Sequence, residues 1–187
     1  MRDLREHQIL DALIEQGACF AILRLPDETS PQFVMQTSGA PILTDDLKAL
    51  NGQQGFVIAP FRISDETPVI VIRPDCRNLA EVDISTEKNR PEKEKGVKQK
   101  NIDKSDYAQL FQRFHKPLTD GTIKKLVLSR SKTIDRKEGF SPGRAFYKAV
   151  EKYSHSCVFL FHTPQSGTWL GSTPEILLAA SALLLSD

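Results

Sequence analysis

The chain has 187 residues, 40% of them hydrophobic, and a formal net charge of +1. It is long enough for one good-sized globular domain with a hydrophobic core. The near-zero charge excludes a general attraction to nucleic acid or to anionic lipid. The first residues mix charges of both signs, and no apolar run approaches the ~20 residues that span a bilayer, so we expect a cytoplasmic protein without a signal peptide.

The three cysteines, Cys19, Cys76 and Cys157, are widely spaced and include no CxxC pair. This spacing favours free thiols over a disulfide framework or a zinc site.

Residues 1–84 have the pattern of an antiparallel α+β domain. Residues 4–16 place Ile9, Leu10, Leu13 and Ile14 on one helical face, and Gly17 can end that helix. The segment ACFAILRL and the segment QFVMQT then predict a hairpin across the turn-like PDETSP. GFVIAPF and PVIVIR predict a second pair of strands around RISDET.

Residues 85–105 predict a flexible linker, because lysines alternate with acids and apolar side chains are almost absent. The alternative is a phosphate-binding lysine cluster. The interleaved Glu87, Glu92 and Glu94 disfavour it, since they prevent a focused basic patch.

Residues 106–187 predict a second domain with two helices and three strands. The first helix would be capped by Asp106 and end near Pro117. Its core face would contain Tyr107, Leu110, Phe111 and Phe114. KKLVLSRSKTI predicts a strand, and Ser141 and Pro142 predict the start of a helix with Phe146, Ala149 and Val150 inward. CVFLFHTP and TWLGSTPEILLAA predict a hairpin that turns at QSG.

Two charged residues lie within these apolar strand patterns. Lys125 shares a strand face with Val127 and would lose solvation if carried inward, which lowers the pKa of a lysine and makes it a general base. Glu175, placed in STPEILL, would have its pKa raised by the same loss of solvation and become a general acid. The pattern alone favours instead a lysine at the start of a strand and a carboxylate that caps or edges a strand. His115 and His162 have no second ligand at metal spacing, and we expect structural roles for both, as for Trp169.

Three segments together resemble the chorismate-utilising enzymes, the family of isochorismate synthase, salicylate synthase and the large subunits of anthranilate and aminodeoxychorismate synthase. They are KLVLSR at residues 125–130, CVFLFHTP at 157–164 and GSTPEILL at 171–178. In that family the first and last appear as a K/Q-V-V-L-S/A-R strand and a G-A/S-S/T-P-E strand at similar spacing. GFVIAPF, at residues 55–61, extends the resemblance to most of the chain.

The resemblance implies a layered β/α/β fold and a chemistry without a redox step. Lys125 would activate a water that attacks C2 of chorismate, and Glu175 would protonate the hydroxyl that leaves C4, with Mg²⁺ holding the ring carboxylate. The amine-transferring branch commonly has Gln at the position of Lys125, so the resemblance favours isochorismate synthase, serving menaquinone or siderophore biosynthesis. Salicylate and anthranilate synthases are the alternatives within the family.

Family members are roughly twice this length, so the resemblance implies the N-terminal half only. We therefore expect an incomplete, truncated chain that is inactive alone and that lacks the Mg²⁺ ligands. An apolar sheet face or edge left exposed would favour self-association or binding of a missing C-terminal half. The alternative of another class is a non-catalytic remnant that serves as an interaction module.

Overall fold

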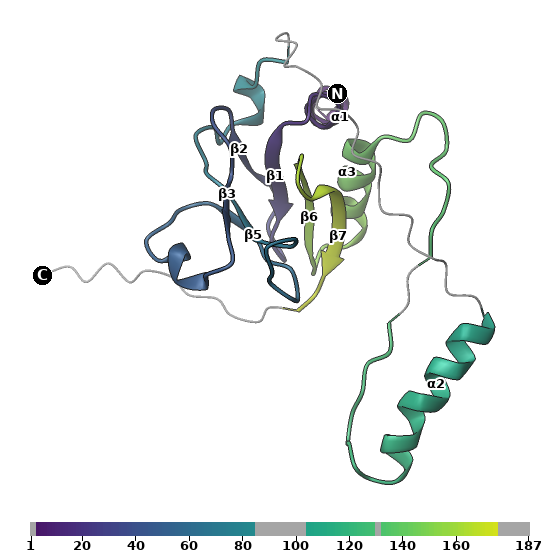
Figure 1. The fold of residues 1–187 in the computed structure, drawn as a ribbon. Coiled ribbons are helices and arrows are strands. Elements are labelled where there is room, and N and C mark those ends of the chain that lie inside the picture. Colours follow the sequence, from purple (N-terminus) through teal and green to yellow (C-terminus); the bar gives the residue numbers. More distant parts are fainter. Residues whose placement is uncertain (1–2, 85–103, 130–131, 176–187) are drawn as a thin grey trace, which may run out of the picture. The chain divides into compact units, whose positions relative to one another are not determined.

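A computed structural model describes residues 3–84, 104–129 and 132–175 of the chain (Figure 1). The chain divides into two compact units. Unit 1 comprises Met1–Glu92 and Ser141–Asp187, and unit 2 comprises Lys93–Phe140. This division differs from the predicted order of domain, linker and domain at residues 84 and 106, because the segment from Ser141 onward folds with the N-terminal part. Most of the predicted linker lies outside the described residues.

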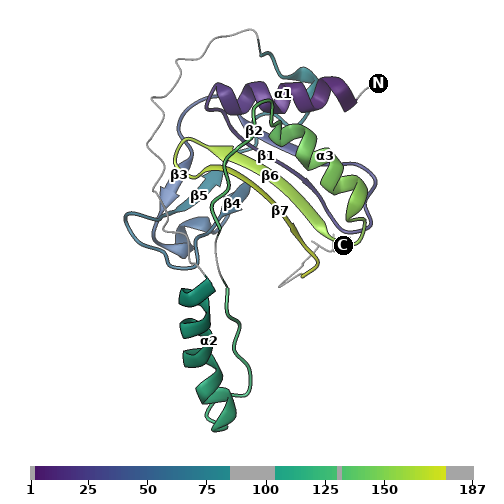
Figure 2. The ribbon, with the colours of Figure 1, turned by 90° about the vertical axis from the view of Figure 1, so that its right-hand side faces the viewer.

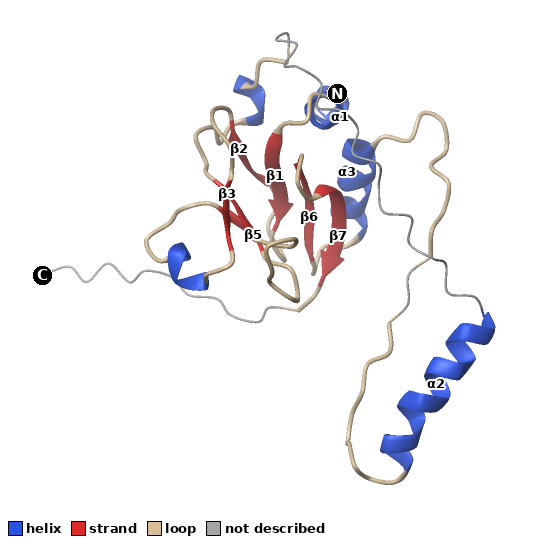
Figure 3. Cartoon of the chain, viewed as in Figure 1, coloured by secondary structure: helices blue, strands red, loops and turns tan. Residues whose placement is uncertain are grey.

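A four-stranded antiparallel sheet, sheet A, forms the centre of unit 1 (Figure 3). Its strands are β1 (Cys19–Arg24), β2 (Gln32–Gln36), β6 (Cys157–Thr163) and β7 (Gly167–Thr173), in the order β2-β1-β6-β7. The sequence predicts the hairpins β1–β2 and β6–β7 correctly. The pairing that joins them, Phe20 opposite His162 through Arg24 opposite Val158, was not predicted.

Two helices, α1 (Asp3–Glu15) and α3 (Pro142–Lys152), lie side by side on one face of sheet A (Figure 2). Side chains from both helices and from alternate strand positions make the larger core. Its buried members are Ile9, Leu10, Leu13, Phe20, Ile22, Phe33, Met35, Leu79, Phe146, Val158 and Leu160. The predicted inward faces of both helices are therefore confirmed.

Local signals end and begin these helices as the sequence predicts. Gly17 has a φ of 69°, the left-handed conformation that glycine adopts without strain, and follows the last turn of α1. Ser141 caps α3 by accepting a hydrogen bond of 2.9 Å from the backbone N–H of Arg144. Pro142 occupies the first turn, where its missing N–H is not needed.

Helices α1 and α3 are joined by polar contacts at the start of α3. Asp11 of α1 accepts hydrogen bonds from the Ser141 hydroxyl and from the backbone N–H of Gly143 at 2.8 Å. A Cβ atom on Gly143 would lie 2.4 Å from the carbonyl oxygen of His7, so only glycine permits this close approach of the two helices.

A second sheet, sheet B, packs against the opposite face of sheet A. Its strands are β3 (Ile42–Thr44), β4 (Phe56–Ile58) and β5 (Val69–Ile72), in the order β3-β5-β4. Ile72 packs there against Cys19, Ala21 and Phe161. The predicted pairing of the second two strands is correct, but β3 was not predicted. Short 3₁₀ turns, η1 (Leu47–Leu50) and η2 (Leu79–Glu81), follow β3 and β5.

In unit 2 the predicted helix is present but the predicted strand is not. Helix α2 (Lys104–Thr119) begins before Asp106 and contains Pro117 in its last turn, where only one intrahelical hydrogen bond is lost. Of its predicted core face, Tyr107, Leu110 and Phe114 are half-buried, whereas Phe111 is 46% exposed. Residues 124–129, the described part of KKLVLSR, form no strand, and within the described residues they have no neighbouring strand to supply hydrogen bonds.

The three cysteines are free thiols, as the sequence predicts. Cys19 is buried and the other two are half-buried. No helix in the described parts of the chain is both long and apolar enough to cross a membrane.

Arg24, at the end of β1, is 2% exposed and holds the C-terminal end of α3. Its guanidinium donates hydrogen bonds to the carbonyl oxygens of Tyr153 and Ser154, and to that of Leu25 at 3.0 Å. A cation is favourable at a helix C-terminus, where unpaired carbonyl groups carry partial negative charge.

Replacing Arg24 by Met keeps the aliphatic stem but removes the charged donor from these carbonyl oxygens. We expect the free energy of unfolding to fall by about 1.5–3 kcal/mol, the usual worth of hydrogen bonds to a charged group. Urea denaturation monitored by circular dichroism measures this loss. Arg62→Met, a change at an exposed arginine, is the control and should leave the midpoint unchanged; equal losses in both variants would contradict the role of Arg24.

Candidate functional site

The β6–β7 hairpin carries the segment CVFLFHTP and the first residues of GSTPEILL. Seven residue pairs join the strands, from Cys157 opposite Thr173 to Thr163 opposite Gly167. The turn between them is held by the Thr163 hydroxyl, which accepts a hydrogen bond of 3.0 Å from the backbone N–H of Ser166. Gly167 has a φ of 70°, which a residue with a side chain rarely adopts. The hairpin is therefore a well-defined support for the residues at its end.

Aromatic rings form a row on the hairpin face that is turned away from the helices. The ring of Phe161 lies 5.8 Å from that of Phe159 and 6.3 Å from that of Trp169, centroid to centroid. Gly171 makes room for this row, because a Cβ atom there would lie 2.3 Å from Phe159. Trp169 is nevertheless 57% exposed, so only one side of its ring has the packing role that the sequence predicts.

Glu175 lies two residues beyond β7, with an exposed side chain. Its backbone N–H donates a hydrogen bond of 3.2 Å to the hydroxyl of Thr173, the last residue of the strand. This contact ties the backbone of Glu175 to the hairpin end. The burial that the strand pattern suggested for its carboxylate is absent.

Lys125 lies in unit 2, outside any helix or strand, and its side chain is exposed. The neighbouring Lys124 is exposed as well. The predicted inward position of Lys125 is therefore wrong for the described structure, because a strand that would carry it inward is not formed. Lys125 belongs to unit 2 and Glu175 belongs to unit 1.

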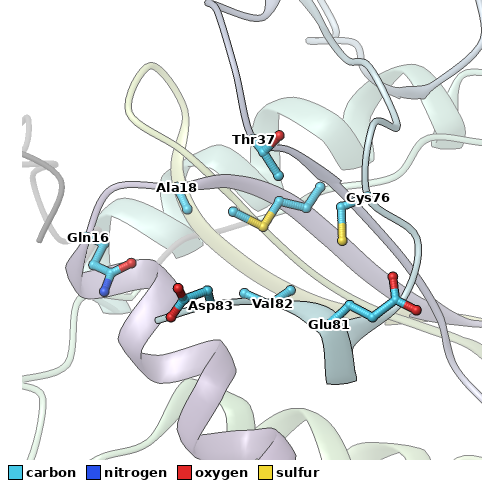
Figure 4. Close-up of a pocket in the computed structure, with 8 residues that line it drawn as sticks. Gln16, Ala18, Thr37, Cys76, Glu81, Val82 and Asp83 are labelled. Atoms are coloured by element: carbon cyan, nitrogen blue, oxygen red, sulfur yellow. The ribbon is translucent and has the colours of Figure 1, made fainter. Parts of the chain in front are cut away.

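Two open cavities lie among the described residues of unit 1, and Glu175 lines neither of them. The smaller, of about 320 Å³, has apolar walls that include Met35 and Val82 (Figure 4). Figure 4 shows the carboxylate side chains of Glu81 and Asp83 on either side of Val82. These acids disfavour a dianionic ligand such as chorismate, because like charges repel.

The larger cavity, of about 670 Å³, lies between helix α3 and the strand β2. Its charged lining residues are Glu6, Glu151 and Arg77. Glu6 is already engaged by the hydroxyl of Tyr147 at 2.8 Å. Two acids against one arginine give this cavity no excess of positive charge for a carboxylate ligand.

His162 sits on the helix-covered face of β6, where its ring lies 6.5 Å from that of Phe20. Its Nδ1 is 2.9 Å from the hydroxyl of Thr168, while Nε2 has no hydrogen-bond partner among the described residues. Burial lowers the pKa of His162 below its ordinary value of 6.5. The expected structural role fits this setting.

Cys157 and Asp75 are two further groups whose surroundings shift their pKa. Burial raises the pKa of the Cys157 thiol, against the opposing charge of Arg24. Burial works to raise the pKa of Asp75, but hydrogen bonds from Thr37 and Ser38 outweigh it and hold the value below its usual range. Neither residue adjoins a cluster of other reactive groups within the parts of the chain that the structure describes, so neither indicates a reaction.

A metal site is not formed by the described residues. Among them, no three His, Cys, Asp or Glu side chains gather closely enough to hold an ion. The donor set that Mg²⁺ requires, several oxygen ligands around one point, is therefore not met by this part of the chain.

Because the pKa of His162 is lowered in the folded protein, the unfolded chain binds a proton more readily. Stability is then full above the unfolded pKa near 6.5 and falls as the pH drops below it. We expect the free energy of unfolding to fall between about pH 7.5 and 5.5, and to fall less in His162→Gln, which keeps a partner for Thr168. His115→Gln, at an exposed histidine of unit 2, is the control. An unchanged pH dependence in His162→Gln would disprove the assignment.

Comparison with known proteins identifies the family. A family model described as chorismate binding enzyme matches residues 49–186, which is most of the chain and includes the segments KLVLSR and GSTPEILL. No curated protein and no solved structure matches the chain. The fold, antiparallel sheets with packed helices in an α+β arrangement, is consistent with this family. The chain belongs to the chorismate-binding enzyme family.

Proposed function

We propose that the chain takes part in the conversion of chorismate to isochorismate, as in isochorismate synthases. The observation that carries the proposal is the family match over residues 49–186, which includes both Lys125 and Glu175. The choice of reaction rests on Lys125. Adding water to a ring requires a base, whereas an amine delivered by a partner is already a nucleophile.

In this reaction the atoms and electrons balance without an oxidant. Lys125 removes a proton from water, whose oxygen forms a bond to C2 of the ring. The double bonds shift, and the bond between C4 and its hydroxyl breaks as Glu175 supplies a proton, so one water enters and one leaves. In the reverse direction the two residues exchange roles.

The resemblance also implies Mg²⁺, which would neutralise a carboxylate of the substrate. The described residues do not fit such an ion, since no suitable ligand cluster exists among them. We therefore assign no step of the reaction to a metal held by this part of the chain.

Replacing Lys125 by Ala should lower isochorismate formation by about 10²–10⁴-fold, the usual contribution of a general base. Lys125→Arg should be as inactive as Lys125→Ala, because arginine keeps the charge but does not give up its proton. Product is measured by chromatography, with the purified chain and in extracts of cells whose gene carries each variant, so that any partner is present. Lys124→Ala, at the exposed neighbour, is the control. Full activity of Lys125→Arg would show that only the charge matters and would exclude the base.

Replacing Glu175 by Gln should lower the same activity by about 10²–10⁴-fold, because the amide cannot protonate the leaving hydroxyl. Stability should not change, since the side chain is exposed and no described residue depends on it. Glu66→Gln, at another exposed acid of unit 1, is the matched control. Equal activity of Glu175→Gln and the control would remove Glu175 from the mechanism.

A second candidate, a non-catalytic interaction module, is favoured by the exposure of both residues. The assay above separates the two candidates. Loss of isochorismate formation in Lys125→Ala extracts supports the enzyme, whereas extracts and purified chain that are indifferent to Lys125 support the module.

A further inference from the structure

The two outer edges of sheet A differ in how they are covered. Beyond β2, the segment around Cys76 occupies the edge. The backbone N–H of Met35 donates to the Cys76 carbonyl at 2.8 Å, and the N–H of Cys76 donates to the Met35 carbonyl at 3.1 Å. Asp75 also accepts a hydrogen bond of 2.7 Å from the N–H of Thr37. Beyond β7, no described strand pairs with the outer edge.

Strand β7 also lacks the features by which proteins protect an exposed edge. Its sequence, GTWLGST, contains no charged residue and no proline. All seven residues stay in register with β6, so no bulge twists the edge away. Charges, prolines and bulges are the usual means of preventing edge-to-edge pairing. Trp169 and Leu170, 57% and 41% exposed, add apolar surface beside the edge.

We propose that β7 pairs with β7 of a second copy of this chain, antiparallel and about a two-fold axis at Leu170. A two-fold axis limits the possible registers. Hydrogen-bonded and non-hydrogen-bonded pairs alternate along an antiparallel ladder, so one residue must lie directly opposite its own copy, and the axis passes between these two residues. Leu170 is the middle residue of Gly167–Thr173, so an axis there pairs all seven positions. An axis at any other residue leaves part of the strand unpaired.

Side chains support this register. Trp169 lies opposite Gly171 of the partner subunit, on the face that carries the aromatic row. The ring of Phe159 covers this glycine, because it fills the place of the missing side chain. Trp169 of each copy therefore meets the edge of the partner's aromatic row. Aromatic contacts between neighbouring strands are favourable sheet pairs.

Charge does not oppose the pairing. The nearest charged residue after β7 is Glu175, five positions from the axis. The two copies of Glu175 therefore lie at opposite ends of the paired strands, about 34 Å apart at 3.4 Å per residue. With no like charges facing each other, the uncharged strand is complementary to itself.

Cysteine cross-linking tests the register directly. In Leu170→Cys the two new thiols lie directly opposite each other, with Cα atoms about 4.5–5.5 Å apart, which a disulfide can bridge. In Thr168→Cys, on the same strand and face, the two thiols are displaced by four residues, about 14 Å, beyond the reach of a disulfide. Leu43→Cys, at an exposed leucine of sheet B, controls for random oxidation.

We expect a covalent dimer on non-reducing gels for Leu170→Cys, at least tenfold more than for Thr168→Cys or Leu43→Cys. Equal cross-linking of all three variants would show random collisions and overturn the proposal, as would its absence in all three. More dimer from Thr168→Cys than from Leu170→Cys would overturn the register.

A second measurement does not depend on added thiols. Trp169 is the single tryptophan of the chain, so its fluorescence reports on β7 alone. We expect the wild type to sediment as a dimer at high concentration, and its emission to shift to the red on dilution as Trp169 becomes solvated. Leu170→Lys places two charges opposite each other and should remain monomeric, whereas Leu43→Lys should behave as the wild type. A wild type that is monomeric throughout, or a Leu170→Lys dimer, would refute the proposal.

Discussion

The antiparallel pairing of β1 with β6 is the constraint on which unit 1 depends. It places Phe20 opposite His162 and Arg24 opposite Val158, joining segments from the two ends of the described chain. Without it, α1 and α3 would lack a common sheet to cover, and β6–β7 would be an isolated hairpin of marginal stability. Because the entropy of closing a loop grows slowly with its length, the chain between these strands can include a whole additional unit.

Arg24 connects this strand pairing to the helix layer. A buried cation usually needs a carboxylate, but Arg24 is surrounded instead by carbonyl oxygens at the end of α3. Its position therefore fixes where α3 ends relative to β1. At the other end of α3, Asp11 and Gly143 fix where the helix begins relative to α1. Helix α3 is held at both ends, which explains why Phe146 between them is fully buried.

The sequence predicts what depends on neighbouring residues and misses what depends on distant ones. Gly17, Ser141 and the turn before Gly167 act through local backbone chemistry, so the helices and hairpins they delimit are found at the expected places. The division into two sheets and the β1–β6 pairing are set by which distant strands meet, and alternation of apolar residues does not contain that information. Glu175 was expected within the second strand of a predicted hairpin and lies two residues beyond the end of that strand. Lys125 was assigned to a strand that has no neighbour in the described chain.

The same missing neighbour explains why Lys125 is exposed. Val127, two residues further on, is 77% exposed, although its apolar side chain belongs inside a folded protein. A strand paired along this segment would bury Val127 and, on the same face, remove water from Lys125. Loss of solvation is what makes a lysine a base at neutral pH. The packing of an apolar segment and the activation of the proposed base thus require one event, the supply of a neighbouring strand to residues 125–129.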